Sequence, residues 1–339
     1  MGTTTSLNRY GPARGWDVSA RWDGWEDRML DADRLAVLVE IAHAGSIAGA
    51  AQRLSFTPSA VSQQLGKLER DLGCQLVQRH PRGVRLTPIG QMLVTHAETV
   101  VGELRTAEQS VRAMLGEAPA PLALGTFASA GQSLVPQALA GFRRNHPSVA
   151  LRLLDLEPPD GYGLVSSADL DLLITHRYPG VPLPDPRGLQ RRLLTSDALR
   201  LVLPASHPKA GGGRLTLERL SADEWISGSG GVPNRVCLEQ LARSAGIGLH
   251  VAFETKDYQV TLALIEAGLG IALVPATVLR QVSSPRLAVR DLDGLRPARD
   301  IYVVHHKRPA ALVSEMIAEL RGAADAIRGD AAGRPGSAG

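Results

Sequence analysis

The polar side chains between residues 59 and 70 have the types and the spacing to contact DNA. Val61, Leu65 and Leu68 recur at intervals of four and three residues, which is the pattern of one buried helix face. The opposite face then carries short hydroxyls, an amide and two cations, which can donate to phosphates and hydrogen bond to base edges. This outward face holds Ser59, Ser62, Gln63, Lys67 and Arg70.

Two short helices must position this face. Ser46 can cap a first helix, in which Ala50 and Ala51 are small enough for a second helix to cross closely. Phe56 is expected to fill the turn, Thr57 can cap the second helix, and Pro58 suits its first position. The spacing predicts a helix-turn-helix over residues 46–71, with the second helix in the major groove. An ordinary helical hairpin with a solvated polar face has the same spacing and remains an alternative.

A basic segment follows the second helix. Residues 79–85, RHPRGVR, contain three arginines and one histidine but no acid, around a proline and a glycine. Residues 51–90 contain six Arg or Lys and two acids, so this part of the chain is locally basic. A glycine-centred turn between short strands indicates a wing that contacts the DNA backbone or minor groove. The residues assigned to DNA binding are Ser46, Thr57, Pro58, Ser59, Ser62, Gln63, Lys67, Arg70, Arg79, Arg82 and Arg85.

The run from residue 44 to residue 91 resembles the N-terminal domain of LysR-type transcriptional regulators. The matching pieces are Gly45-Ser46, Ala50-Ala51, the TPSAVSQQL segment, Leu72-Gly73 and the RGVRLTPIG segment. A weaker resemblance extends to about residue 326. It implies a bacterial regulator of α/β class that has an α-rich winged helix-turn-helix domain, a long linker helix and a two-lobed, periplasmic-binding-protein-like effector domain. Gly66 departs from the family, which usually has a larger side chain at this position.

Composition and motifs favour a binding protein over an enzyme. A chain of 339 residues with 44% hydrophobic residues and a net charge of +3 is long enough for two or three globular domains. It has no glycine-rich phosphate loop, HExxH motif or serine elbow, and adjacent strand residues such as His305 and His306 face opposite ways. Cys74 and Cys237 have no metal-ligand spacing. We therefore expect no catalytic residue, metal or cofactor.

The two ends of the chain differ from the rest. Residues 1–28 hold three of the four tryptophans in polar sequence, and Met29 resembles the family's usual start, so we expect a non-native or disordered extension. Residues 29–87 form the expected DNA-binding domain, and residues 329–339 an expected disordered tail. No apolar stretch has the composition of a membrane span or a signal peptide, which predicts a cytoplasmic protein with no membrane partner.

A long linker helix is predicted over residues 88–116. Apolar side chains alternate four and three residues apart before a GEAPAP linker, which indicates a seam for another helix. Packing against the same chain is the alternative. The resemblance implies instead that the helix pairs two subunits on a dyad-related operator, in a homodimer or homotetramer, with RNA polymerase as a further partner of an activator. The expected seam residues are Leu93, Ala97, Val100, Leu104, Ala107 and Val111.

The sequence pattern of residues 121–328 predicts an α/β effector domain. Strand-like residues 122–126, an amphipathic helix over 132–145 and strand-like residues 149–157 predict a parallel sheet. The resemblance implies lobe one at about 121–180 and 307–328, and lobe two at about 181–306. The segment EPPDGYG, residues 157–163, replaces a helix that is regular in the family and suggests a shortened wall.

In folds of this kind a small-molecule effector binds between the lobes, at strand ends and helix N-termini. Free helix N-termini would favour an anionic effector. Gly/Ser turns that only cap helices are the alternative interpretation. The expected contacts are Ala128, Ser129, Gln132, His176, Ser227, Gly228 and Ser229, and Arg177 and Tyr178 could complete a polar site.

A second function remains open at this point. A small-molecule sensor whose winged helix no longer reads DNA would share the same domains. The basic residues Arg79, Arg82 and Arg85 favour retained DNA binding over this alternative.

Overall fold

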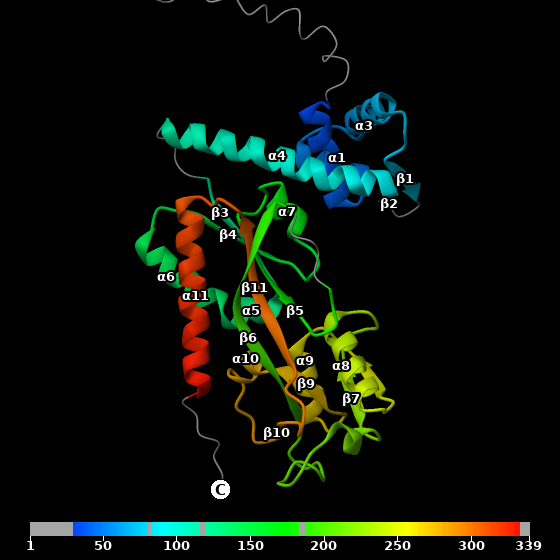
Figure 1. Cartoon of the computed structure of the whole chain (residues 1–339), viewed down its shortest axis with the longest axis vertical. Helices are drawn as coiled ribbons and strands as arrows, with labels where there is room; N and C mark the ends of the chain where they lie inside the picture. The colour runs from blue at the N-terminus through cyan, green and yellow to red at the C-terminus, as the bar shows by residue number, and fades with distance from the viewer. Residues whose placement is uncertain (1–29, 81–82, 116–119, 183–187, 333–339) are drawn as a thin grey trace, which may run out of the picture. The chain divides into compact units, whose positions relative to one another are not determined.

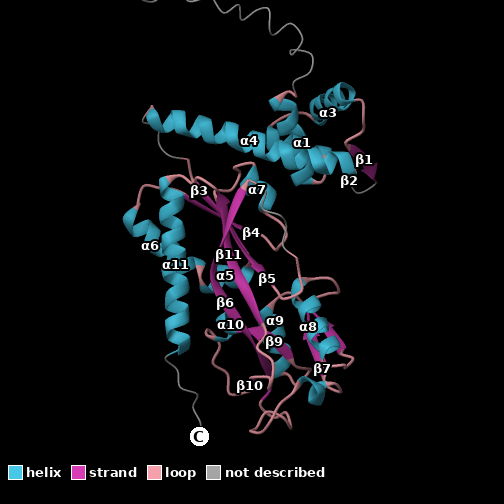
Figure 2. Ribbon diagram, viewed as in Figure 1, coloured by secondary structure: helices cyan, strands magenta, loops and turns pink. Residues whose placement is uncertain are grey.

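The computed structural model describes residues 30–80, 83–115, 120–182 and 188–332 (Figures 1 and 2). The chain divides into two compact units, residues 1–97 and 98–339. The expected extension over residues 1–28, the start at Met29, Arg82 and most of the expected tail lie outside the described residues. Among the described residues, no helix has the length and apolar character that a membrane crossing requires.

The first unit is a winged helix-turn-helix. It contains α1 (Ala32–Ala44), α2 (Ile47–Leu54), α3 (Pro58–Leu72) and an antiparallel hairpin of β1 (Val77–His80) and β2 (Gly83–Leu86). The core between the helices includes Leu38, Ile41, Ala50, Val61 and Leu68, each at most 1% exposed. The periodic apolar positions of the sequence therefore make the core, and the predicted fold of this unit is confirmed.

The helix α4 (Pro88–Met114) has 27 residues and continues from the first unit into the second. It begins where Thr87 Oγ1 accepts a hydrogen bond from the amide of Gly90 at 3.0 Å, an N-cap that precedes Pro88. In the second unit, Arg105 forms an ion pair with Asp169 and donates to the carbonyl of Ser167 at 2.9 Å. The predicted long helix is present.

Lobe one of the second unit is a sheet with helices on both faces. Its strands are β3 (Leu122–Thr126), β4 (Leu151–Asp155), β5 (Leu172–Arg177), the first half of β6 (Leu189–Pro204) and β11 (Ala298–His306). The main core lies between this sheet and α5 (Ala128–Ser133), α6 (Val135–Asn145) and α11 (Ala311–Ala332), and includes Phe142, Ile174, Met316 and Leu320 (Figure 1). The strand pairs β3–β4 and β3–β5 are parallel, as the sequence predicts.

Lobe two is built on the second half of β6. This half pairs with β9 (Ala272–Pro275) and β10 (Leu287–Arg290), and β7 (Glu224–Ser227) pairs separately with β8 (His250–Glu254). The helices are α8 (Pro233–Ser244), α9 (Tyr258–Glu266) and α10 (Ala276–Leu279), with a 3₁₀ turn at Leu217–Leu220. Trp225 is fully buried at the centre of its core, with Leu201 and Leu203.

The bounds of the lobes and of the tail differ from those expected. Because β11 pairs with β5 and with residues 189–198 of β6, these segments belong to lobe one, so the lobes exchange near residues 198 and 298 rather than at 181 and 306. The helix α11 continues to Ala332, so the expected tail begins later than 329. The segment after β4 contains only the five-residue α7 (Tyr162–Ser166), in agreement with the shortened segment expected there.

Candidate nucleic-acid interface and interlobe cavity

Local hydrogen bonds fix the two helices of the candidate nucleic-acid interface. Ser46 Oγ accepts from the amide of Gly49 at 3.0 Å, and Thr57 Oγ1 accepts from the amide of Ala60 at 3.2 Å. These side chains occupy the N-cap positions that the sequence predicts. Gly73 ends α3 with φ 65°, a left-handed conformation that favours glycine. Thr57 and Ser46 therefore have structural roles besides any contact with DNA.

The outward face of α3 is polar and accessible. Ser59, Gln63 and Arg70 are exposed, whereas Ser62 and Lys67 are half-buried. Ser59 lies 2.9 Å from Thr57 through their hydroxyl oxygens, beside exposed Pro58. These side chains follow one another along a single helix face, which is the arrangement that a recognition helix requires.

Phe56 differs from the expectation. Its side chain is 52% exposed, so it does not fill the turn between α2 and α3. The turn is held instead by the Phe56 amide, which donates to the carbonyl of Ala51 at 2.9 Å.

The hairpin β1–β2 occupies the place of the expected wing. The amide of Val84 donates to the carbonyl of Gly45 at 2.9 Å, which joins the hairpin to the end of α1. A Cβ on Gly83 would lie 2.4 Å from this carbonyl oxygen, so only glycine fits the approach. Arg85 is exposed on β2, Arg79 is in β1, and Arg82 lies outside the described residues.

The expected seam of α4 divides into two parts. Leu93 and Ala97 are buried in the first unit, at 8% and 0% exposed. Val100, Leu104 and Val111 are 44%, 48% and 57% exposed, and Ala107 is exposed as well. Packing within the chain thus accounts for the first two positions, whereas the last four present apolar surface.

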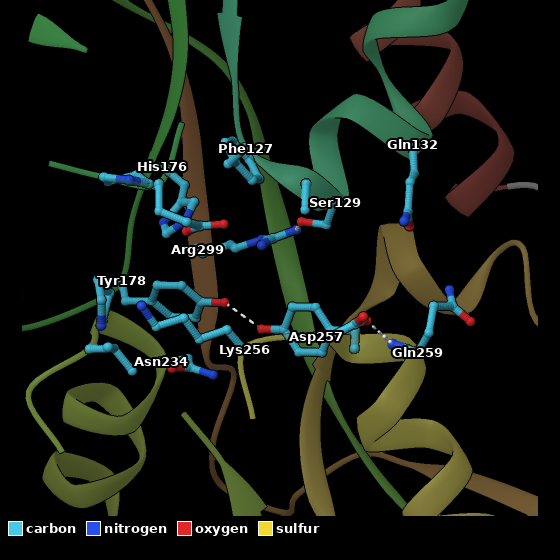
Figure 3. Close-up of a pocket in the computed structure, with 16 residues that line it drawn as sticks. Phe127, Ser129, Gln132, His176, Tyr178, Asn234, Lys256, Asp257, Gln259 and Arg299 are labelled. Atoms are coloured by element: carbon cyan, nitrogen blue, oxygen red, sulfur yellow. Dashed lines mark hydrogen bonds and ion pairs between the residues drawn. The ribbon is translucent and has the colours of Figure 1, made fainter. Parts of the chain in front are cut away.

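A cavity of about 260 Å³ lies between the lobes of the second unit (Figure 3). The start of α5 and the end of β5 line it from lobe one, and the starts of α8 and α9 line it from lobe two. Four of the expected contacts are among its walls, namely Ala128, Ser129, Gln132 and His176.

The other three expected contacts do not line this cavity. Ser227 ends β7, where its carbonyl accepts from the amide of Thr255 at 2.8 Å, and Ser227 and Gly228 are buried. Ser229 is exposed in the turn that follows. The segment between β7 and α8 reaches the cavity further along, at Val232, Pro233 and Asn234, which lead into α8. Arg177 is also outside the cavity, because it is exposed and paired with Asp300 at 3.0 Å.

A buried ion pair lies at the boundary of the lobes. Arg299 is 1% exposed and its Nε and Nη2 donate to Asp197 Oδ2 at 3.0 and 2.9 Å. Nη2 also donates to Ser129 Oγ of lobe one at 2.9 Å, and Asp197 accepts from the amide and hydroxyl of Thr277 of lobe two. The pair therefore connects both lobes, and Arg299 lines the cavity.

Two tyrosines meet across the same cavity. The hydroxyls of Tyr178 and Tyr258 lie 2.8 Å apart (Figure 3), and burial raises the pKa of each, so both are neutral at physiological pH. Beside them, Asp257 caps α9 by accepting from the amide of Gln259 at 2.7 Å. Tyr258, Asp257 and Gln259 were not expected from the sequence, although the sequence KDYQ before an apolar helix is an N-cap pattern.

His176 and Glu157 form the end of the cavity in lobe one. Burial lowers the pKa of His176, which is 6% exposed and is therefore neutral at pH 7. The imidazole packs edge-on against Phe127 and Tyr178, with ring centroids 4.5 and 5.2 Å apart. Glu157 Oε2 is 3.8 Å from His176 Nε2, and the interaction with His176 is the main cause that lowers the pKa of Glu157.

In the described part of the chain, no three His, Cys, Asp or Glu side chains lie close enough together to bind a metal ion. His305 is buried, its Nδ1 lies 2.7 Å from the carbonyl of His306, and His306 Nε2 lies 2.7 Å from the carbonyl of Val165. These two histidines contact backbone rather than each other.

Two family descriptions match the chain. The bacterial regulatory helix-turn-helix protein of the lysR family matches residues 32–91, and the LysR substrate binding domain matches residues 116–325. The transcriptional regulator CbbR of Xanthobacter flavus is 30% identical over 278 residues, which cover 81% of this chain and 80% of that protein. CbbR of Rhodospirillum rubrum is 28% identical over 82% of this chain and 92% of its own length.

A solved structure has the same fold over most of the chain. A variant of full-length OxyR from Pseudomonas aeruginosa superimposes with a TM-score of 0.64 at 20% identity, covering 87% of this chain and 95% of that one. The two matched regions coincide with the winged helix-turn-helix and with the two-lobed unit that contains the cavity. The chain belongs to the LysR family of DNA-binding transcriptional regulators, with an N-terminal helix-turn-helix domain and a C-terminal effector-binding domain.

Proposed function

We propose that this regulator binds dyad-symmetric operator DNA as a homo-oligomer and that a small molecule in the interlobe cavity alters operator occupancy. The observation that carries the proposal is the face of α3, where exposed Ser59, Gln63 and Arg70 follow a capped N-terminus. Exposed hydroxyl, amide and guanidinium groups along one helix suit both base edges and phosphates. The exposed Arg85 of the hairpin adds a cation beside the duplex.

The apolar surface of α4 supports the homo-oligomer. Val100, Leu104 and Val111 lie on one line of the helix and are about half exposed. A second copy of α4 would cover this line and place two α3 helices on two half-sites. A dimer or tetramer would form in this way, with RNA polymerase as an additional partner if the regulator activates.

The strands β6 and β11 support a response to an effector. They pass between the lobes, and the Asp197–Arg299 pair joins Ser129 to Thr277 at the same place. A bound molecule that contacts both lobes would stabilise one degree of closure over another. The change would alter the angle between the DNA-binding domains of the oligomer, and hence DNA occupancy or bending.

The proposal is tested by selecting operator DNA from a genomic fragment library with the full-length protein at near-physiological salt. We expect recovered fragments to share a dyad-symmetric site. If only weak, sequence-independent binding is recovered over a range of salt concentrations, the alternative applies, namely a sensor whose winged helix no longer reads DNA.

Gln63→Ala is expected to reduce affinity for the recovered site by about 1–3 kcal/mol, because the side chain that reads a base edge is removed. Ser62→Ala should have a smaller effect in the same direction, since Ser62 is half-buried. Gln109→Ala removes an exposed amide from α4 and serves as the control. Fluorescence anisotropy with the operator and with a scrambled duplex measures the change. An equal loss on both duplexes would contradict base reading by Gln63.

A further inference from the structure

One helix N-terminus that faces the cavity, that of α9, is capped by a side chain of this chain. Asp257 accepts from the amide of Gln259 at the start of α9 at 2.7 Å. At α8, Asn234 Oδ1 accepts from the amide of Arg235 at 2.9 Å, but the N-cap residue Val232 provides no side-chain cap. The capped start of α9 is therefore less able to attract an anionic group, whereas α5 and α8 begin without a side-chain cap.

The charges around the cavity also disfavour a simple anion. The positive charge of Arg299 is neutralised by Asp197, which lies directly behind it and is 3% exposed. The other charged side chains that line the cavity are two carboxylates, Glu157 and Asp257, and one cation, Lys256. His176 is neutral. The site thus carries one more carboxylate than cation, and a carboxylate ligand would increase that excess.

Glu157 forms no ion pair with a described arginine or lysine, although the charges of Arg299 and Lys256 help to lower its pKa. Among the described residues its carboxylate has one close charged or titratable partner, the neutral His176 at 3.8 Å, and no arginine or lysine nitrogen within ion-pair distance. Glu157 is half exposed, lines the cavity and stands beside the aromatic rings of Phe127, His176 and Tyr178. An ammonium group is attracted both by a carboxylate and by aromatic rings, so the two features favour the same kind of ligand.

We propose that the interlobe cavity binds a small molecule that carries a protonated amine, with its ammonium group at Glu157. This inference rests on the proposed effector function of the cavity. The Ser129 oxygen accepts from Arg299, so its hydroxyl proton is available to donate to the ligand. It would donate to a polar group at the end of the ligand opposite the ammonium, near Gln132 and Gln259 (Figure 3). The cavity of about 260 Å³ is larger than the ~150 Å³ that benzene occupies in an engineered cavity, so it fits a molecule of roughly ten to twelve non-hydrogen atoms.

Amino acids and simple amines both carry an ammonium group. The two classes can be distinguished with sets of compounds that share one carbon skeleton and differ only in their amino and carboxylate groups. We would test sets such as L-phenylalanine, 2-phenylethylamine and 3-phenylpropanoate, and the corresponding sets for the other common amino acids, by thermal shift and calorimetry on the full-length protein. At least one amine or amino acid is expected to bind, and its deaminated acid is not. If the amine binds without a carboxylate group, the ligand is an amine. If binding requires both the amino and the carboxylate group, the ligand is an amino acid.

Glu157→Gln is expected to weaken the best amine-bearing compound by about tenfold or more, because a charge-assisted hydrogen bond is lost. Asp160→Asn makes the same charge change at an exposed residue outside the cavity and should leave the affinity unchanged. Circular dichroism of both variants establishes that they fold.

Three results overturn the inference: preferential binding of the deaminated acids, no binding by any amine-bearing compound, or equal affinity in Glu157→Gln and the unaltered protein. The operator selection is a separate experiment that uses no compound. A failure to recover an operator would therefore count against the regulatory function, whereas a preference for acids would count only against the amine.

Discussion

Gly66 lies in the middle of α3 and Gly73 caps its C-terminal end, so their backbones differ. A Cβ on Gly66 would meet only Arg70 Nη1, at 3.7 Å, so Gly66→Ala should raise the free energy of unfolding by about 1 kcal/mol. Gly73 has φ 65°, where a side chain is strained, so Gly73→Ala should lower it by about 1 kcal/mol. Urea denaturation followed by circular dichroism compares the two, and a shift in the same direction would contradict the argument.

Asp197 illustrates a different residue-scale effect, the burial of a charge. Asp197→Asn would leave the guanidinium of Arg299 without its counter-charge, which we expect to destabilise the effector domain by about 3–5 kcal/mol. Asp291→Asn breaks the exposed pair with Arg200, at 2.8 Å, and should cost less than about 1 kcal/mol. Thermal denaturation of both variants measures the contrast. Similar losses in the two variants would show that burial of the Asp197 pair has little effect.

At the scale of elements, the second half of α4 makes the clearest prediction. Leu104→Glu would place a charge on the exposed apolar line of the helix, and should raise the dissociation constant of the oligomer by more than about tenfold. Gln109→Glu adds the same charge on the opposite side of the helix and is the control. Light scattering coupled to gel filtration would measure the mass of both. An unchanged oligomer in Leu104→Glu would place the interface elsewhere.

The elements that the sequence predicts are those that local interactions determine. Thr57, Pro58 and the spacing of Val61, Leu65 and Leu68 define α3 within fifteen residues. The ion pair of Asp197 with Arg299 joins residues 102 positions apart, and nothing local to either residue indicates the other. Ser227 and Gly228 were expected in the cavity because a Gly/Ser turn precedes a helix, but the length of the turn moves the wall to Asn234. Half of the cavity therefore depends on long-range pairing that the sequence does not reveal.

At the scale of the whole molecule, net charge is a poor guide to DNA binding. The chain carries only +3, but residues 51–90 alone have six Arg or Lys and two acids, a local excess of four positive charges. Arg85→Ala should weaken binding to all duplexes and reduce the slope of log affinity against log salt by about 0.9, because one phosphate contact is lost. Arg192→Ala removes an exposed cation from the second unit and should leave the slope unchanged. Arg82, where the same effect is expected, lies outside the described residues. Anisotropy titrations at several salt concentrations measure the slopes, and an unchanged slope in Arg85→Ala would remove Arg85 from the interface.

The pairing of β6 with β11 has a consequence for protein engineering. Ala198 and Ala298 are direct partners in adjacent antiparallel strands, so the ninety-nine residues between them begin and end at neighbouring points. Lobe two is in this sense an insertion into a loop of lobe one. Its removal, with a two-residue turn in its place, would join the strands as a β-hairpin and leave the sheet with α5, α6 and α11 intact. Related sensors could accordingly exchange this lobe as a cassette, acquiring a new ligand preference while keeping the same DNA-binding domain.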